Sequence, residues 1–276
     1  MPDAPLLDIV DVHKNLGGKQ VLAGVNLSIY GGECVCVIGQ SGTGKSVLLK
    51  HILGIMYPDK GQILVEGKDI TRGTVQEWNA FRRRIGMVFQ GAALFDSLTV
   101  GENIGFALQE HTDLSARQIR KVVEEKLAIV DMPGVEGKMP GELSGGMRKR
   151  VGIARGLAGD PEIMLFDEPT TGLDPVRAAE VDHLILRMRV KLKKTVIVVT
   201  HDMASAYRIA TKIAMLHDGT IRFLGTPAEV KGTSDPFVHQ FVNGLTEGPI
   251  KSEATQRWAR DDEDAPVVGG AGKKAE

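Results

Sequence analysis

The strongest constraint on this chain is a glycine-rich segment, GQSGTGKS, that follows an apolar run and precedes a helical pattern. The segment fits G-x-x-x-x-G-K-[ST], in which glycines let backbone amides wrap around phosphate oxygens. The run before it, Cys34–Ile38, is nearly all apolar, as expected for a strand covered on both faces. A helix is predicted from about Lys45 to Leu53, and its N-terminus adds partial positive charge. The pattern therefore predicts a phosphate site at the edge of a sheet.

In this pattern Lys45 reaches the outer phosphates and the Ser46 hydroxyl holds Mg²⁺. The alternative, a glycine-rich turn with no ligand, is disfavoured because a strand and a helix flank the segment on the correct sides. The predicted phosphate-contacting residues are Gly39, Gln40, Ser41, Gly42, Thr43, Gly44, Lys45 and Ser46.

Adjacent acids end a second apolar run, EIMLFDEP. Asp167 is predicted at the carboxyl end of a buried strand, where ligands bind in open parallel sheets, and there it would steady Mg²⁺ through water. Glu168 follows and is the candidate general base for an attacking water. The alternative is a pair of solvated residues at a strand end.

His201 and Gln90 end two further apolar runs, IVVTHD and IGMVFQ. A lone histidine is more often structural, but beside the other motifs His201 becomes a candidate to contact a γ-phosphate and align Glu168 with the water. Gln90 is a candidate to contact the metal and the attacking water at the junction with a helical segment.

The pattern of runs predicts an α/β protein. Strands are expected at LLDIVDV, VLAGVNLSIY, QILVEG, IGMVFQ, EIMLFDE and TVIVVTHD, with HKNLGGKQ as a turn-rich connection and KIAMLHDG and TIRFLG as a last hairpin. A helix is expected near Pro175–Lys191, and residues 91–159 have helical periodicity, as in SARQIRKVVEEKLAIV. The helical stretch is therefore read as an insertion in the α/β core.

Composition limits the functional classes. A length of 276 residues predicts one large or two modest domains, and a net charge of −1 gives no overall attraction to nucleic acid. The start, MPDAPLLDIV, lacks the pattern of a signal peptide, and no apolar run approaches the ~20 residues that cross a bilayer. We expect a cytoplasmic chain that reaches a membrane through a partner. Cys34 and Cys36 are interpreted as buried structural residues, not a metal site.

The basic runs Arg82–Arg84 and Arg148–Arg150 are short and lack interleaved aromatics, which argues against nucleic-acid binding. A solvated face is expected for the first, and extra charge beside a partner's phosphates is an option for the second.

A second phosphate-binding element is predicted in ELSGGMRKRVGIARGLAG. Ser144 can cap a helix there, and Gly145 and Gly146 permit close approach of a ligand. An apolar stripe follows at helical spacing, formed by Met147, Val151, Ala154 and Ala158. The alternative for this segment is a purely structural cap.

In chain order, GQSGTGKS, Gln90, LSGGM, LFDE, LDP and THD resemble the ATP-binding cassette (ABC) family from about Leu6 to Gly244. The resemblance implies a P-loop NTPase core with a mostly parallel sheet, an N-terminal antiparallel β subdomain and an inserted helical subdomain at about 91–160. It also implies ATP and Mg²⁺ as ligands, and a homodimer formed through ATP. In such dimers Ser144, Gly145 and Gly146 of one chain would cap the ATP held by the other. Asp174 would lie on the dimer seam.

Within this family, LSGGM followed by RKRV, the segment FQGAALFDSLTVGENIGFAL and the tail QFVNGLTEGPI resemble the ATPase subunits of Mla-type phospholipid transporters. Most cassettes have LSGGQ, and Met147 fits this branch. The resemblance implies an ATPase on the cytoplasmic face of the inner membrane. Its implied partners are a membrane permease (MlaE-like), a small STAS-domain regulatory subunit (MlaB-like) and a periplasmic MCE-domain protein (MlaD-like), with phospholipid as cargo between the inner and outer membranes.

After about Gly244 the composition becomes charged and poor in apolar residues, so a C-terminal extension is expected at 246–276, with its last dozen residues disordered. The same resemblance implies an ATPase domain at residues 5–245. The segment Phe237–Ile250 would reach the neighbouring subunit. A groove near Gln90 to Phe106 would take a permease helix, with Leu94, Phe95 and Phe106 as apolar contacts; core packing is the alternative role of these three.

One departure concerns the base of the nucleotide. Where the family stacks adenine on an aromatic ring, this chain has Leu16, which loses ~1 kcal/mol of stacking. Looser base selectivity is therefore a hypothesis.

Three other functions stay open. They are the ATPase of another importer of small solutes, a DNA-repair or translation ATPase, and a non-hydrolysing binding subunit. The tail argues against the first. The lack of a long coiled-coil insertion or a tandem cassette argues against the second, and the presence of both Glu168 and His201 argues against the third.

Overall fold

The structure is a computed structural model that describes residues 4–251. The expected disorder of the last dozen residues lies outside this range. The chain divides into two compact units, Met1–Val230 and Lys231–Glu276. The functional boundary expected near residue 245 stays a prediction.

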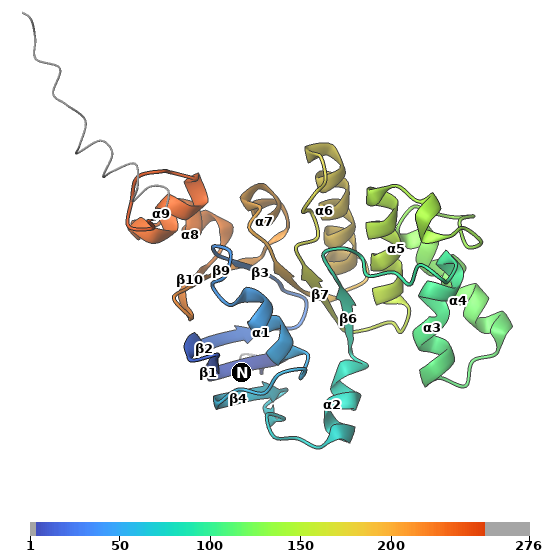
Figure 1. The fold of residues 1–276 in the computed structure, drawn as a ribbon, viewed down its shortest axis with the longest axis horizontal. Coiled ribbons are helices and arrows are strands. Elements are labelled where there is room, and N and C mark those ends of the chain that lie inside the picture. The colour runs from blue at the N-terminus through green and yellow to red at the C-terminus, as the bar shows by residue number, and fades with distance from the viewer. Residues whose placement is uncertain (1–3, 252–276) are drawn as a thin grey trace, which may run out of the picture. The chain divides into compact units, whose positions relative to one another are not determined.

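The first unit is built around a six-stranded sheet with the strand order β10-β9-β3-β8-β7-β6 (Figure 1). Its strands pair in parallel except for the β9–β10 hairpin, so the predicted mostly parallel core is confirmed. Every residue of β3 and β8 is buried, which explains their continuous apolar sequences. The strands are β3 (Cys34–Ile38), β6 (Ile85–Val88), β7 (Ile163–Asp167), β8 (Thr195–Val199), β9 (Lys212–His217) and β10 (Thr220–Gly225).

A second sheet is antiparallel, with the order β2-β1-β4-β5, and it forms the N-terminal β subdomain. Its strands are β1 (Leu7–Leu16), β2 (Lys19–Ile29), β4 (Lys60–Val65) and β5 (Lys68–Asp69). The expectation that HKNLGGKQ is a turn-rich connection is wrong over most of its length. The strands continue through it until Leu16 pairs with Lys19, so only Gly17 and Gly18 turn the chain. Both glycines have positive φ, as a two-residue hairpin requires.

Helices form the other regular structure within residues 4–251. They are α1 (Lys45–Ile52), α2 (Val75–Arg82), α3 (Val100–His111), α4 (Ala116–Ile129), α5 (Gly145–Leu157), α6 (Pro175–Val190), α7 (Met203–Ile209), α8 (Pro227–Gly232) and α9 (Pro236–Asn243), with a 3-10 turn, η1, at Pro140–Glu142. No helix within residues 4–251 is long and apolar enough to cross a membrane.

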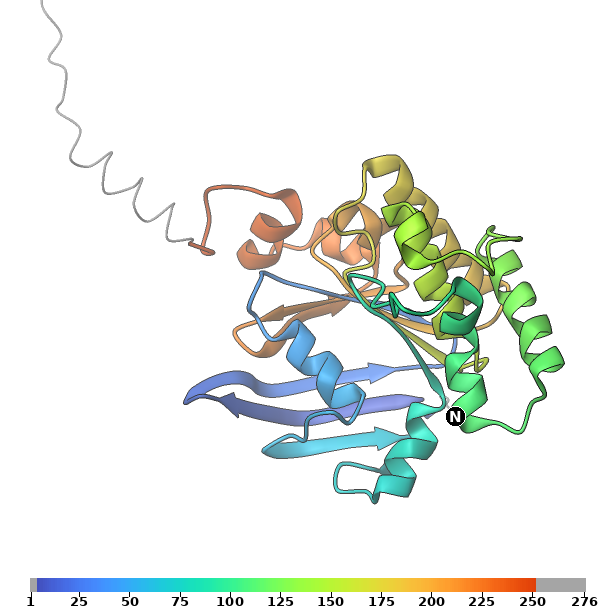
Figure 2. The same cartoon turned by 45° about the vertical axis from the view of Figure 1, so that its right-hand side comes forward.

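The predicted helical insertion is confirmed as the group α3, α4 and α5, which pack on one another while α5 also packs on β6 (Figure 2). Capping boxes begin two of these helices: Thr99 and Glu102 cap α3, and Ser115 and Gln118 cap α4. Thr74 and Glu77 cap α2 in the same way. That helix was not predicted, although the spacing of the two residues is a readable signal.

The run Arg82–Arg84, expected to be a solvated face, is exposed or half-buried, and two of its residues also bind other parts of the chain. Arg84 donates to the carboxylates of Glu66 and Glu162, at 2.6–3.1 Å, and so ties the end of β4 to the start of β7. Arg82 donates to the carbonyls of Leu53 and Gly54 at 2.9 and 2.7 Å. These bonds satisfy carbonyls at the end of α1.

The described part of the second unit, residues 231–251, folds around a buried glutamine. Gln240 lies on α9, and its side-chain amide donates to the carbonyl of Ile250 at 2.9 Å. Its Oε1 accepts from the backbone N–H of Ile250 at 2.7 Å. Gly248 has a φ of +149, and a Cβ there would lie 2.3 Å from Gln240 Oε1. The segment after α9 therefore folds back onto that helix.

We predict that Leu165→Ala in β7 lowers the free energy of unfolding by about 2–5 kcal/mol, because it leaves a cavity in a fully buried strand. Chemical denaturation of the purified chain measures this change. The control is Leu224→Ala in β10, where the side chain is 44% exposed and a loss below about 1 kcal/mol is expected. Equal losses in the two variants would contradict the assignment of the core.

Candidate active site

The phosphate loop follows β3 directly and needs its glycines. Gly39, Gly42 and Gly44 have φ values of +151, +82 and +103, a region that other residues rarely adopt. A Cβ on Gly39 would lie 2.4 Å from the carbonyl oxygen of Leu216. The hydroxyl of Thr43 donates to the carbonyl of Gln40 at 2.9 Å and closes the loop.

Lys45 is buried beneath this loop. Its ammonium donates to the carbonyls of Gly39 at 2.7 Å and Gln40 at 2.8 Å. Burial lowers the pKa of Lys45, and the nearby Glu168 and Asp167 oppose that shift. Ser46 is exposed in the first turn of α1. The loop thus holds a cation and an exposed hydroxyl at a helix N-terminus, which suits a phosphate with a bound metal.

Asp167 ends β7 as predicted, and Glu168 is the next residue. Burial is the main cause that raises the pKa of Asp167, followed by the charge of Glu168, while Lys45 and Lys50 lower it. Glu168 has a φ of +50, a conformation that costs a non-glycine residue about 1–2 kcal/mol. Its backbone N–H donates to the carbonyl of Val199 at 2.9 Å. The neighbouring strand therefore helps to hold this strained residue.

The Glu168 carboxylate is oriented by two side chains. Nδ1 of His201 lies 2.8 Å from Oε2 of Glu168, and the Thr171 hydroxyl donates to the same oxygen at 3.1 Å. The side chain of His201 is 61% exposed whereas that of Glu168 is 14% exposed. His201 therefore lies on the solvent side of a mostly buried carboxylate. Such a pair can accept a proton from a water held at the edge of the sheet.

Strand register places these residues at one edge. Val199 pairs with both Val37 of β3 and Asp167 of β7, which puts the phosphate loop, His201 and Glu168 beyond the carboxyl ends of three adjacent strands. Gln90 follows β6, the next strand, and is exposed. The structure thus places four predicted elements at the same edge of the sheet. They are the phosphate loop, the pair Asp167 and Glu168, His201, and Gln90.

The second phosphate element is elsewhere in the chain. Ser144 caps α5, and its Oγ accepts the Met147 N–H at 3.3 Å. Ser144 and Gly145 are exposed, and α5 packs on β6, α3 and α4. Figures 1 and 2 both show α5 apart from α1, the helix that follows the phosphate loop. A phosphate held by the loop would therefore not meet the N-terminus of α5 from the same chain.

Asp174 and Leu16 also lie on exposed ends of elements. Asp174 caps α6 by accepting the backbone N–H groups of Val176 and Arg177, and the Arg177 N–H is the largest cause that lowers its pKa. Leu16, at the end of β1, is 38% exposed. The hairpin β1–β2 borders the loop, since a Cβ on Gly44 would lie 3.0 Å from Leu22.

The donor groups fit Mg²⁺ only together with a nucleotide. Within residues 4–251 no cluster of three or more His, Cys, Asp or Glu could hold a metal. The Ser46 hydroxyl and the Asp167 carboxylate are hard oxygen donors of the kind that Mg²⁺ takes alongside phosphate oxygens and water. Cys34 and Cys36 are both buried in β3, as interpreted from the sequence.

Sequence reasoning missed several residues that support the site. Thr170 donates its hydroxyl to Asp202 Oδ2 at 3.2 Å, and Asp202 caps α7 directly after His201. The fully buried Asp182 of α6 holds Ser205 and Arg208 of α7. The only sequence signal for these contacts was the threonine pair beside Glu168, because the partners are far apart in the chain.

Residues 22–171 match the family described as ABC transporter. The chain belongs to this family. It is an ABC-type ATPase, and both the fold expected from the ABC resemblance and the recognition of the family are confirmed.

Relatives match most of the chain. It is 42% identical over 262 residues to the protein TRIGALACTOSYLDIACYLGLYCEROL 3, chloroplastic, of Arabidopsis thaliana, covering 89% of this chain and 76% of that protein. It is 42% identical over 255 residues to the probable ribonucleotide transport ATP-binding protein mkl of Mycobacterium tuberculosis, covering 90% and 71%. It is 37% identical over 246 residues to the intermembrane phospholipid transport system ATP-binding protein MlaF of Haemophilus influenzae, covering 89% and 93%.

A solved structure shares the fold. It is a dimeric ATP-binding cassette in a post-hydrolysis state bound to ADP and Pi, with a TM-score of 0.73 and 32% identity over 80% of this chain and 98% of that one.

We predict that Gly39→Ala weakens ATP binding at least ~10-fold, because the added Cβ strains the backbone and collides with the Leu216 carbonyl. Titration with a fluorescent ATP analogue measures the affinity. Gly159→Ala is the control, because a Cβ there meets nothing within 4 Å. Unchanged affinity in Gly39→Ala would contradict the role of this loop.

Proposed function

We propose that this chain is the ATP-hydrolysing subunit of a transporter that moves phospholipid between the inner and outer membranes. The main support for ATP hydrolysis is the contact between Glu168 and His201 beside the phosphate loop. The match to MlaF over 93% of that protein supports the cargo class. The name of the mkl relative points instead to ribonucleotide, so a small-solute cargo is the second candidate.

In the proposed reaction the loop amides and Lys45 bind the outer phosphates of ATP. Glu168 accepts a proton from a water as its oxygen attacks the γ-phosphorus, and the bond from that phosphorus to the bridging oxygen breaks to release ADP. His201 orients the water and Glu168 at the γ-phosphate. Ser46, Asp167 and Gln90 would hold Mg²⁺, which neutralises phosphate charge when bound.

The chain acts as a homodimer in this proposal. The exposed N-terminus of α5, with Ser144, Gly145 and Gly146, would cap the ATP held by the loop of the second chain, and Asp174 would lie at the seam. Each ATP then contacts both chains, so its binding favours the closed dimer, and loss of the γ-phosphate lets the dimer reopen.

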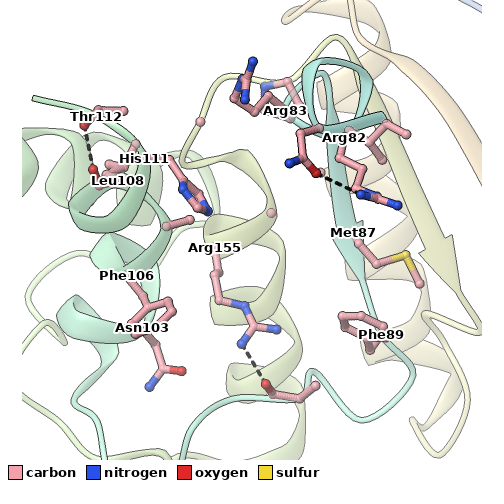
Figure 3. A pocket seen from close by; sticks show the side chains of 18 of the residues that line it. Arg82, Arg83, Met87, Phe89, Asn103, Phe106, Leu108, His111, Thr112 and Arg155 are labelled. Carbon is pink, nitrogen blue, oxygen red and sulfur yellow. Dashed lines mark hydrogen bonds between the residues drawn. The ribbon is translucent and has the colours of Figure 1, made fainter. Parts of the chain in front are cut away.

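A cavity between the sheet and the insertion is the proposed docking site of a cytoplasmic permease helix. It measures about 690 Å³, and side chains from β6 and α3 face it with Arg155 of α5 between them (Figure 3). Phe95 and Phe106 line it, are 47% and 42% exposed, and pack with ring centroids 5.2 Å apart. Leu94, also among the described residues, is half-buried and does not line this cavity.

The same cavity adjoins the segment that carries Gln90. Arg155 donates to the carbonyls of Ala92 and Ala93 at 2.8 and 2.7 Å, and both alanines have positive φ. A helix docked against Arg155 would therefore press on the strained backbone next to Gln90. This gives the permease a physical route to the hydrolysis site.

The other proposed partners are those that the Mla-type resemblance implies. They are a STAS-domain regulatory subunit and a periplasmic MCE-domain protein, with the chain held at the cytoplasmic face of the inner membrane by the permease. The segment Phe237–Ile250, folded around Gln240, would reach the neighbouring ATPase subunit.

We predict that Glu168→Gln lowers the turnover number for ATP at least ~100-fold while ATP still binds, because the general base is lost and the phosphate loop is intact. Phosphate release and nucleotide titration measure the two effects. The control is Glu125→Gln on α4, whose side chain is 59% exposed. Turnover in Glu168→Gln equal to that of the control would exclude Glu168 as the base.

Charged substitutions at the cavity should break the complex. Phe95→Glu and Phe106→Glu are expected to lose the permease during purification, because a carboxylate replaces an apolar contact. Val190→Glu, at a 62% exposed position of α6, is the control and should retain it. Retention of the permease by both phenylalanine variants would place the docking site elsewhere.

The cargo is tested by purifying the tagged chain from its own membranes in mild detergent and identifying the bound proteins and lipids by mass spectrometry. A permease with an MCE-domain protein and enriched phospholipid is expected. A permease with a solute-binding protein and no enriched lipid would overturn the lipid cargo and favour the small-solute alternative.

A further inference from the structure

Lys149 makes a contact that the motifs do not explain. It lies on α5, the helix that Ser144 caps, and its side chain is half-buried. Its ammonium donates to the carbonyls of Pro169 and Thr171, each at 2.7 Å. One option for the run Arg148–Arg150 was to add positive charge beside a partner's phosphates. The ammonium of Lys149 is instead directed into its own chain.

The two carbonyls belong to the turn that carries the Glu168 carboxylate. This turn begins at the strained backbone of Glu168, with a φ of +50, and closes where the Thr171 N–H donates to the Glu168 carbonyl at 3.3 Å. The Thr171 hydroxyl then donates to Glu168 Oε2 at 3.1 Å. Lys149 therefore binds the backbone of Thr171, whose hydroxyl orients the Glu168 carboxylate.

Burial of the Lys149 ammonium has a free-energy cost that a role in packing alone would not explain. Burial lowers the pKa of Lys149, and the charge of Glu168 partly opposes this. A half-buried ammonium is stabilised only if hydrogen-bond acceptors replace its lost water, and hydrogen bonds from a charged donor are stronger than neutral ones. The two carbonyls supply those acceptors, so the ammonium and the turn fix each other.

We propose that Lys149 is a positioning residue for ATP hydrolysis, which holds the Glu168–Thr171 turn and ties it to the helix capped by Ser144. This inference rests on the proposed role of Glu168 as the base. It has a consequence for the proposed dimer, in which the α5 N-terminus would face the ATP held by the other chain. Lys149 then links the capping of one ATP to the geometry of the base that acts on the other.

The test uses the full chain in its purified transporter complex. Lys149→Met removes the charge and both hydrogen bonds at similar length. We expect its kcat for ATP to fall ~10-fold or more with KM changed less than ~2-fold, since a misplaced catalytic group affects the chemical step and leaves the phosphate loop intact. Lys149→Arg, which keeps charge and donors, should restore most of the kcat.

The matched control is Lys121→Met on α4, whose side chain is 78% exposed. Active sites are counted by bound ATP, so a partly unfolded preparation does not imitate a low kcat. If Lys149→Met does not fold, Lys149→Gln carries the test, with a smaller loss of kcat expected because an uncharged amide NH₂ group remains as a donor. A kcat like that of the control, or no rescue by arginine in a folded variant, would overturn the proposal.

A double-mutant cycle adds a readout that general destabilisation would not give. Thr171→Val removes the hydroxyl that binds Glu168, and we expect the loss of kcat in Lys149→Met/Thr171→Val to be smaller than the product of the single losses. A loss equal to that product would contradict action through this turn. Glu168→Gln in the same assay separates the two hypotheses. Full ATP turnover in Glu168→Gln would refute Glu168 as the base. An inactive Glu168→Gln together with a fully active Lys149→Met would refute only the role of Lys149.

Discussion

The parallel pairing of β3, β8 and β7 is the constraint on which the site depends. Their backbone hydrogen bonds fix a register in which Val37, Val199 and Asp167 are level. The residues that follow are the phosphate loop, His201 and Glu168. The register itself brings them to one edge of the sheet, because apolar strands that bury both faces carry the polar residues that follow them.

The separation of α5 from the phosphate loop gives meaning to two phosphate elements in one chain. The loop encloses Lys45 with its own carbonyls, whereas the exposed Ser144 and Gly145 begin a helix that packs on β6 and the insertion. Two chains paired head to tail would bring the phosphate loop of one chain and the α5 N-terminus of the other to each bound ATP. Free energy from ATP binding can then drive closure, since ATP makes more contacts in the closed state than in the open one.

Much of the fold and of the motif geometry could be predicted, because apolar runs and glycine spacing are local signals. The hairpin through Leu16 was misjudged because HKNLGGKQ is rich in turn formers, and cross-strand pairing overrode that local preference. The contacts of Thr171, Asp182 and Lys149 could not be predicted, because they depend on where a side chain points after the sheet and insertion have packed. The match of the motifs to the ABC family is confirmed, whereas the roles of Glu168, His201 and Gln90 stay predictions.

A mixing experiment tests the shared site most directly. Lys45→Ala removes the loop cation in one preparation, and Ser144→Arg blocks the α5 N-terminus in another. Each variant alone should be inactive as an ATPase, because both sites of its dimer lack one element. We predict that mixing the two restores ATP hydrolysis, since a mixed dimer has one site with an intact loop and an intact α5 N-terminus. A mixture as inactive as its parts, or full activity of Ser144→Arg alone, would contradict it.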